Sequence, residues 1–268
     1  TPYSGLDQGF EFFFEQNFPG GPLGSLLDAA RDFLAADDGR PVFLFVHTYR
    51  VHSPYRPDVD ERKQRYVELY REASARGFLG PKVAQMPPEI TAEMRGLYDQ
   101  GASELDAEFG PWFEELERSG RLARGLFVFT SDHGEAFHEH GRFLHGDAPH
   151  EEVARIPLFL VGAGVEPGDV TFGASLVDLY PTLMVRAGLA PPAGLAGTDL
   201  FTLAGERMLF SHTRMRGTHH LGIIEGSRKL LATRPGEDVS LPRDVLAVYD
   251  LTRDPLERAG VGADQAVD

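Results

Sequence analysis

Cysteine is missing from this chain of 268 residues. Its absence excludes disulfide bonds and thiolate metal sites. Long apolar runs are missing too, and none approaches the roughly 18 residues that a membrane-spanning helix needs. The longest runs, such as 156–165, are typical of buried strands. We therefore expect no membrane segment in this chain.

Positive charge is scarce. The chain has 26 Lys and Arg residues against 41 Asp and Glu residues, which gives a formal net charge of −15 and a pI of about 5.1. Such a surface repels the phosphates of nucleic acids, so we expect no nucleic-acid partner. A small anionic substrate could bind only where a metal or local cations reverse the sign of the charge inside a cleft.

Several familiar catalytic signatures are also missing. The sequence contains no Gly-x-Ser-x-Gly elbow, no glycine-rich phosphate loop and no His-Glu-x-x-His motif. It starts at Thr1, without Met and without a signal-like segment. We therefore expect a truncated or processed form of a longer protein.

Apolar runs alternate with helical patterns through most of the chain. Unbroken apolar runs at 42–46, 126–130 and 156–161 predict strands that are buried on both faces. Such strands are typical of parallel sheets, so we expect the three to be neighbours in one mostly parallel sheet. Apolar residues recur at helical spacing at 23–34 and 91–118. Strands alternating with helices predict an α/β fold whose sheet lies between helices, with ligands bound at the carboxyl ends of the strands.

The charged stretch at 56–76 predicts a helix or a loop on the surface. The residue pattern changes again after about residue 205. Short strand-like segments separated by turn residues follow at 208–210, 222–225, 229–233 and 245–249. They predict a small antiparallel α+β subdomain. The predicted domains are therefore 1–204 and 205–268.

Histidine is concentrated in one region, because five of the ten histidines fall between His133 and His150. Asp132 and His133 follow a predicted strand directly, and Gly134 permits the turn that lets both side chains reach one ion. An imidazole with a carboxylate suits a divalent metal ion. The alternative is an Asp-His pair that caps the next helix.

The loop after this pair adds further imidazoles. His140 and His145 could hold an anionic substrate oxygen as imidazolium, or protonate a leaving group, if they lie near a metal. The alternative is a solvated, histidine-rich loop, which is our interpretation of His138 and His150.

Two more histidines, His47 and His52, follow the apolar run at 42–46. If that run forms a strand beside 126–130, both histidines reach the same edge of the crevice. A single His after a strand is more often a structural hydrogen-bonding residue, so both interpretations stay open for each of them.

The order and spacing of these motifs resemble the sulfatase family of the alkaline-phosphatase superfamily. The matching segments are 129–135, 139–141, 145–146, 151–152 and 155–158, with supporting matches at 5–10, 45–49, 51–55, 177–183, 249–251 and 254–257. The resemblance implies an alkaline-phosphatase-like fold, with residues 1–204 as the C-terminal part of the catalytic domain. It also implies a periplasmic or extracellular location.

The resemblance assigns roles residue by residue. Asp132 and His133 would be ligands of one divalent metal ion, with Ca²⁺ first and Mn²⁺ or Zn²⁺ as alternatives. His145 would contact the oxygens of the sulfate or phosphate group. His52 would contact the transferred group and protonate the leaving oxygen, whereas Asp178 would be structural.

This chain departs from the family pattern at its most important residue. The family's nucleophile lies in an N-terminal Cys- or Ser-x-Pro-x-Arg motif that matures to formylglycine, and the chain contains no such motif. Two further metal-binding aspartates are expected in the same missing N-terminal portion. Arg50 stands where related sequences often have Asp, and His150 where Tyr is common. We therefore expect this chain alone to be inactive.

Three functions remain open. The first is a metal-dependent sulfuric-ester hydrolase acting on an anionic sulfate ester, with the missing N-terminal portion of the same protein as its partner. The second keeps the superfamily but acts on phosphate esters, as a phosphodiesterase, phosphonate hydrolase or phosphoethanolamine transferase. The third is a non-catalytic fragment that keeps the fold without turnover.

Overall fold

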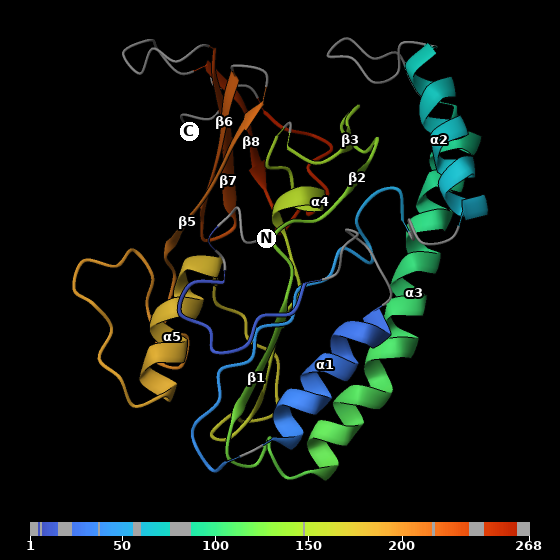
Figure 1. Cartoon of the computed structure of the whole chain (residues 1–268). Helices are drawn as coiled ribbons and strands as arrows, with labels where there is room; N and C mark the ends of the chain where they lie inside the picture. The colour runs from blue at the N-terminus through green and yellow to red at the C-terminus, as the bar shows by residue number, and fades with distance from the viewer. Residues whose placement is uncertain are drawn as a thin grey trace. The chain divides into compact units, whose positions relative to one another are not determined.

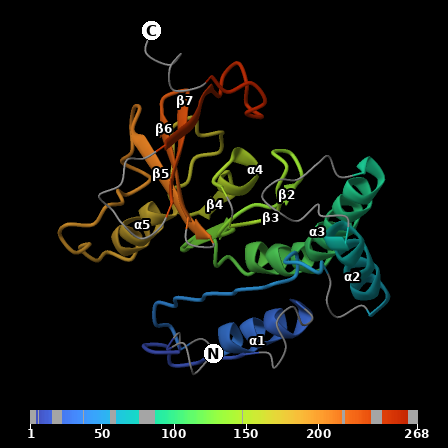
Figure 2. The same ribbon diagram turned by 90° about the horizontal axis from the view of Figure 1, so that it is seen from above.

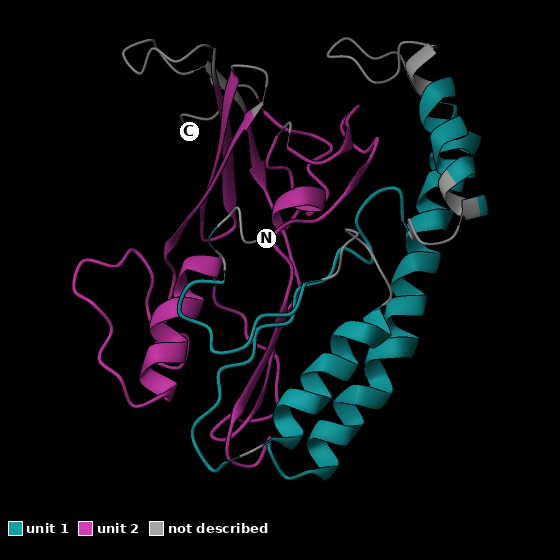
Figure 3. Ribbon diagram, viewed as in Figure 1, with its two compact units in different colours: residues 1–121 teal, residues 122–268 magenta. Residues whose placement is uncertain are grey.

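The computed structural model describes residues 5, 7–15, 23–36, 38–55, 60–75, 87–146, 148–215, 218–235 and 244–261 (Figure 1). The chain forms two compact units, residues 1–121 and residues 122–268 (Figure 3). The domain boundary that the sequence suggested near residue 205 stays a prediction. None of the described helices has the length and apolar character needed to cross a membrane.

The described part of the first unit contains three helices. They are α1 (Leu23–Ala35), α2 (Asp60–Ala75) and α3 (Pro88–Arg118). α1 buries Leu23, Leu27 and Ala30, which lie on one face at helical spacing. Arg31 Nε of α1 lies 2.6 Å from Glu115 Oε2 of α3 and joins the two helices. The helices predicted at 23–34 and 91–118 are confirmed.

The strand predicted at 42–46 is not found. These residues are extended, but in the described part of the chain they pair with no strand. Phe43 and Phe45 expose 61% and 68% of their surface. An apolar run predicts that a segment is buried, but it does not identify the segment that packs against it.

The second unit contains the other two predicted central strands, β1 (Leu126–Thr130) and β4 (Leu158–Gly162). They are neighbours, as predicted, but they run antiparallel, with Leu126 opposite Gly162 and Thr130 opposite Leu158. The mostly parallel sheet is therefore not confirmed. Unbroken apolar runs are common to buried strands of either direction, so the sequence pattern does not fix the direction of pairing.

Short elements connect these strands to the rest of the unit. They are β2 (Ala136–Phe137), β3 (Phe143–Leu144), α4 (Glu151–Ala154), η1 (Leu176–Asp178) and α5 (Leu179–Arg186). Asp178 is fully buried and accepts hydrogen bonds from the Ser175 and Thr198 N–H groups, each at 2.8 Å. Arg207 Nη1 lies 3.0 Å from its carboxylate. The structural role expected for Asp178 is confirmed.

A four-stranded antiparallel sheet follows, as the texture after residue 205 predicted. Its strands are β5 (Met208–Met215), β6 (Thr218–Glu225), β7 (Arg228–Pro235) and β8 (Asp244–Asp250), hydrogen-bonded in sequence order. Figure 1 labels all four strands, and Figure 2 shows β5, β6 and β7 from above. Leu231, Ala247 and Tyr249 form its buried cluster, with Leu251 packed against them. The fold is thus α/β with antiparallel sheets.

Candidate functional site

A tight turn after β1 carries the Asp132–His133 pair. The Gly134 N–H donates to the Val153 carbonyl at 2.8 Å, which ties the turn to α4. A Cβ at residue 134 would lie 2.2 Å from the Glu152 carbonyl oxygen. Only glycine allows this approach, so Gly134 fixes the direction in which the pair leaves the strand.

Asp132 and His133 present two potential metal ligands. His133 Nδ1 lies 2.8 Å from the Gly134 carbonyl, so this nitrogen carries the proton and Nε2 keeps its lone pair. Nε2 lies 3.7 Å from Asp132 Oδ2, and the Asp132 side chain is 78% exposed. Atoms so separated can both bind one ion at ligand distances of about 2.0–2.5 Å. The donor set therefore fits a divalent ion as two ligands.

His145 lies directly on this pair. Its ring stacks on that of His133 at 3.9 Å between centroids, with 28° between the planes. His145 Nδ1 lies 3.0 Å from Glu135 Oε1, and the Glu135 side chain is only 6% exposed. This hydrogen bond outweighs burial and raises the pKa of His145. A cationic imidazole beside a metal-binding pair can hold an anionic oxygen. Sequence reasoning missed Glu135 as the partner of His145.

His52 belongs to the first unit, so its convergence with Asp132, His133 and His145 stays a prediction. Its Nδ1 lies 2.7 Å from the Ser53 carbonyl, and its ring meets Tyr49 edge-on at 5.5 Å. The Nδ1–H therefore donates to the Ser53 carbonyl.

Arg50, the first departure from the family pattern, has a clear structural role. The residue is 1% exposed, and its guanidinium makes a short ion pair with Glu108 of α3. Glu108 also accepts the Gly24 N–H of α1 at 3.2 Å. Arg50 thus anchors the loop that carries His52 to the helices of its unit.

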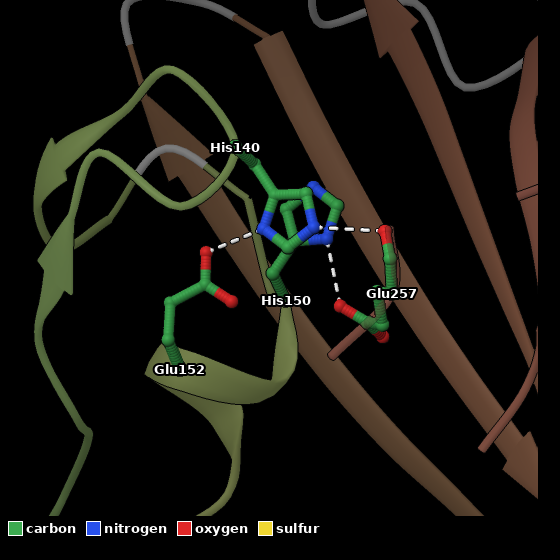
Figure 4. A group of neighbouring side chains, drawn as sticks. All are labelled: His140, His150, Glu152 and Glu257. Carbon is green, nitrogen blue, oxygen red and sulfur yellow. Dashed lines mark hydrogen bonds and ion pairs between the residues drawn. The ribbon is translucent and has the colours of Figure 1, made fainter. Parts of the chain in front are cut away.

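A second group of side chains comes from the β2–β3 turn, from α4 with the residue before it, and from the segment after β8. His140, His150, Glu152 and Glu257 each offer one donor atom, and all four atoms lie within 4.8 Å of one another (Figure 4). Such a group could hold a metal ion. The side chains of His140 and His150 are 15% and 13% exposed, so the interpretation of His150 as a solvated loop residue is wrong.

Three of the four residues in this group could have been found from the sequence. His140, His150 and Glu152 lie in or beside motifs that were recognised. Glu257 follows β8, 107 residues after His150, and no local spacing connects the two.

Known proteins resemble this chain over most of its length. A sulfatase family model matches residues 13–189, which is more than half of the chain. Arylsulfatase K of Xenopus laevis is 37% identical over 112 residues, covering 41% of this chain and 21% of that protein. Arylsulfatase K of Homo sapiens is 33% identical over 184 residues, covering 63% and 33%. An arylsulfatase of Clostridium perfringens is 25% identical over 275 residues, covering 91% and 54%.

Solved structures show the same fold at lower identity. One protein, solved with its substrate D-glucosamine-2-N,6-O-disulfate, has a TM-score of 0.53 and 22% identity, covering 76% of this chain and 43% of its own. A second, from Bacteroides thetaiotaomicron, has a TM-score of 0.54 and 19% identity, covering 66% and 40%. The chain spans between about a fifth and half of the length of the relatives it matches.

Proposed function

Because the chain belongs to the sulfatase family, we propose that it is the C-terminal part of a metal-dependent sulfuric-ester hydrolase. One observation carries the proposal: His145 stacks on His133 at 3.9 Å, beside Asp132 and backed by Glu135. Glu135 raises the pKa of this imidazole, and the protonated ring beside the two proposed metal ligands would hold an oxygen of a sulfate ester.

The metal belongs with Asp132 and His133. Sulfatases generally bind a divalent metal, and we propose Ca²⁺, with Mn²⁺ and Zn²⁺ as the ions to compare. When bound, the ion offsets negative charge on the sulfuryl oxygens. Asp132 supplies an exposed carboxylate oxygen, and Gly134 holds the His133 ring so that Nε2 faces that oxygen.

The remaining residues bind the ester and move a proton. His145 holds an ester oxygen, and Glu135 keeps the His145 ring in place. His52 gives a proton to the departing alkoxide, which raises the rate of ester cleavage by about 10²–10⁴-fold for a general acid of this kind. The nucleophile, matured to formylglycine, and two further metal-binding aspartates come from an N-terminal portion outside this chain.

The experiment compares two proteins, this chain and a longer form that includes the upstream portion. Each is supplied with Ca²⁺, Mn²⁺ or Zn²⁺ and with an aryl sulfate or a phosphodiester. We expect no turnover by this chain and multiple turnovers of the aryl sulfate by the longer form. Preferential cleavage of the phosphodiester would favour the phosphoryl-transfer alternative instead. Turnover by this chain alone, lost on Asp132→Ala, would show that the nucleophile lies within it.

A further inference from the structure

The group around His140 holds more hydrogen-bond acceptors than a neutral imidazole can satisfy. His140 Nδ1 lies 2.7 Å from Glu152 Oε1, and His140 Nε2 lies 2.9 Å from the Glu257 carbonyl oxygen. A carboxylate and a carbonyl only accept hydrogen bonds, and a neutral imidazole donates only one. Both bonds therefore form together only when His140 is an imidazolium.

The charges that surround His140 favour this cation. The ring of His150 stacks on His140 at 3.7 Å, nearly parallel at 4°, and its Nδ1 donates to Glu257 Oε2 at 2.7 Å (Figure 4). Lys229 Nζ lies 2.7 Å from both Glu257 Oε1 and Glu151 Oε1. Two carboxylates thus face one ammonium group, and Glu152 adds a third carboxylate beside His140, so a positive charge on His140 reduces the imbalance. Tyr249 meets the His150 ring edge-on at 6.2 Å.

The contacts fit protons better than a metal ion. Two ligand atoms on one tetrahedral ion, at bonds of about 2.0–2.1 Å, lie roughly 3.3 Å apart. Here both nitrogen–oxygen pairs lie at 2.7 Å, the distance of a charge-assisted hydrogen bond. The lone pairs of two parallel, stacked rings also lie in separate planes and cannot point at one ion. A metal would therefore require the rings to turn.

We propose that protonated His140 is a pH-sensitive latch that joins the β2–β3 turn to α4 and to the segment after β8. The latch is closed while the ring carries both protons. Loss of one proton turns a lone pair of His140 toward either the Glu152 carboxylate or the Glu257 carbonyl, and that contact becomes repulsive. The β2–β3 turn then loosens from the segment that this lone pair faces, while His150 and Lys229 still hold α4 to the segment after β8.

The pKa shifts agree in direction. Burial alone would lower the pKa of His140, but the hydrogen bonds to Glu152 and the Glu257 carbonyl raise it above its ordinary value of 6.5. Burial would raise the pKa of Glu257, but His150 and Lys229 lower it from 4.5 to about 2. The His140 contribution is complete below 6.5 and is lost as pH rises through the raised pKa. The Glu257 contribution is complete above 4.5, so the latch is firmest between these values.

The latch acts on the segment that carries His145. This residue lies between His140 and His150 along the chain, directly after β3. α4 is also tied to the Asp132–His133 turn, because the Gly134 N–H donates to Val153. Opening the latch should therefore loosen the candidate ester-binding residues. This consequence rests on the proposed function, whereas the latch itself does not.

The test follows protons and backbone exchange in the whole chain. We titrate isotope-labelled histidine side chains by NMR and measure amide hydrogen exchange in α4, corrected for the intrinsic rate. At about pH 6 both His140 nitrogens should carry protons. Between about pH 6 and pH 8 corrected exchange in α4 should rise at least severalfold, because the deprotonated ring no longer holds both acceptors.

Variants separate the latch from general effects of pH. His140→Gln should abolish the extra exchange, and Glu152→Gln should lower the pH at which His140 loses its proton. His138→Gln is the matched control on the same turn, because burial lowers the pKa of His138 and its neutral form persists at high pH. This control should keep the wild-type response.

Three results would overturn the latch. They are a neutral His140 at about pH 6, an unchanged exchange response in His140→Gln, and tight Zn²⁺ binding that this variant abolishes. The last result would make the group a metal site instead. If the latch titrates as expected but the longer form hydrolyses no ester, the proposed function fails and the latch stands.

Discussion

His133 keeps Nε2 for a metal because its Nδ1–H donates a hydrogen bond to the Gly134 carbonyl. The hydrogen bond at 2.8 Å sets the tautomer before any ion arrives. Because the tautomer of the His133 ring is already fixed, the ring loses less entropy when it binds a metal ion. The turn at 132–134 should therefore contribute most of the metal affinity of the chain.

We expect Asp132→Ala to weaken Ca²⁺ binding at least as much as an outer-shell change does, by about 10–100-fold. The variant loses the carboxylate ligand while the fold of the turn, held by Gly134, remains. Isothermal titration calorimetry of the chain with each divalent ion measures the change. His145→Ala is the control and should bind the ion with nearly normal affinity. Equal affinity in Asp132→Ala and wild type would contradict the ligand assignment.

The role of His145 needs a readout of catalysis. In the longer form, His145→Ala should lower kcat for an aryl sulfate by about 10²–10⁴-fold, because a positioned cationic or acidic group is lost. Glu135→Gln keeps a hydrogen-bond acceptor but removes the charge, so its effect should be smaller. Steady-state kinetics on both variants tests the order. A larger loss in Glu135→Gln would show that Glu135 itself touches the ester.

Buried charge sets the stability of the contact between α4 and the segment after β8. The side chains of Lys229 and Glu257 are both 0% exposed and lie 2.7 Å apart. Lys229→Met removes one partner of the buried Glu257 carboxylate, which typically costs about 3–5 kcal/mol. Urea unfolding measures the loss. Arg253→Ala is the control, because that 88% exposed side chain lies 3.6 Å from Asp250 and its pair should contribute about 0–1 kcal/mol.

At the scale of elements, backbone geometry decides where the β1–β4 pair ends. Gly162 has a φ of +136°, and a Cβ there would lie 2.2 Å from the Gly125 carbonyl oxygen. We expect Gly162→Ala to cost more than the roughly 1–3 kcal/mol of backbone strain alone. Gly164→Ala, with a φ of +74° and open space around its Cβ apart from the end of Arg186, isolates that strain. Equal Tm values for the two variants would contradict the steric argument.

The sequence predicts elements better than it predicts their partners. Helical spacing identified α1 and α3, and turn residues separated the four strands of the last sheet. Both signals are local. The direction of β1 against β4 and the missing strand at 42–46 depend on segments far along the chain, which no local pattern records. The same limit applies to the candidate site: Asp132, His133 and His145 share one stretch, whereas Glu257 joins its group from 107 residues away.

At the scale of the whole molecule, the most prominent unfavourable feature is the exposure of aromatic side chains to water. Phe43 and Phe45 expose 61% and 68% of their surface on an extended segment, which favours association with another apolar surface. We expect the chain to self-associate as its concentration rises, and Phe45→Ser to shift it toward the monomer. Light scattering after size-exclusion chromatography measures both. A wild-type chain that stays monomeric at high concentration would contradict this expectation.

The anchor that Glu257 provides also has a consequence for the order of events during synthesis. His150 leaves the ribosome 107 residues before Glu257. At about 5–20 residues per second, translation needs roughly 5–20 s to cover that interval. Through this time the turn that carries His140 and the loop that carries His145 lack their C-terminal anchor. The nascent chain therefore completes the group around His140 only after its last sheet has been made.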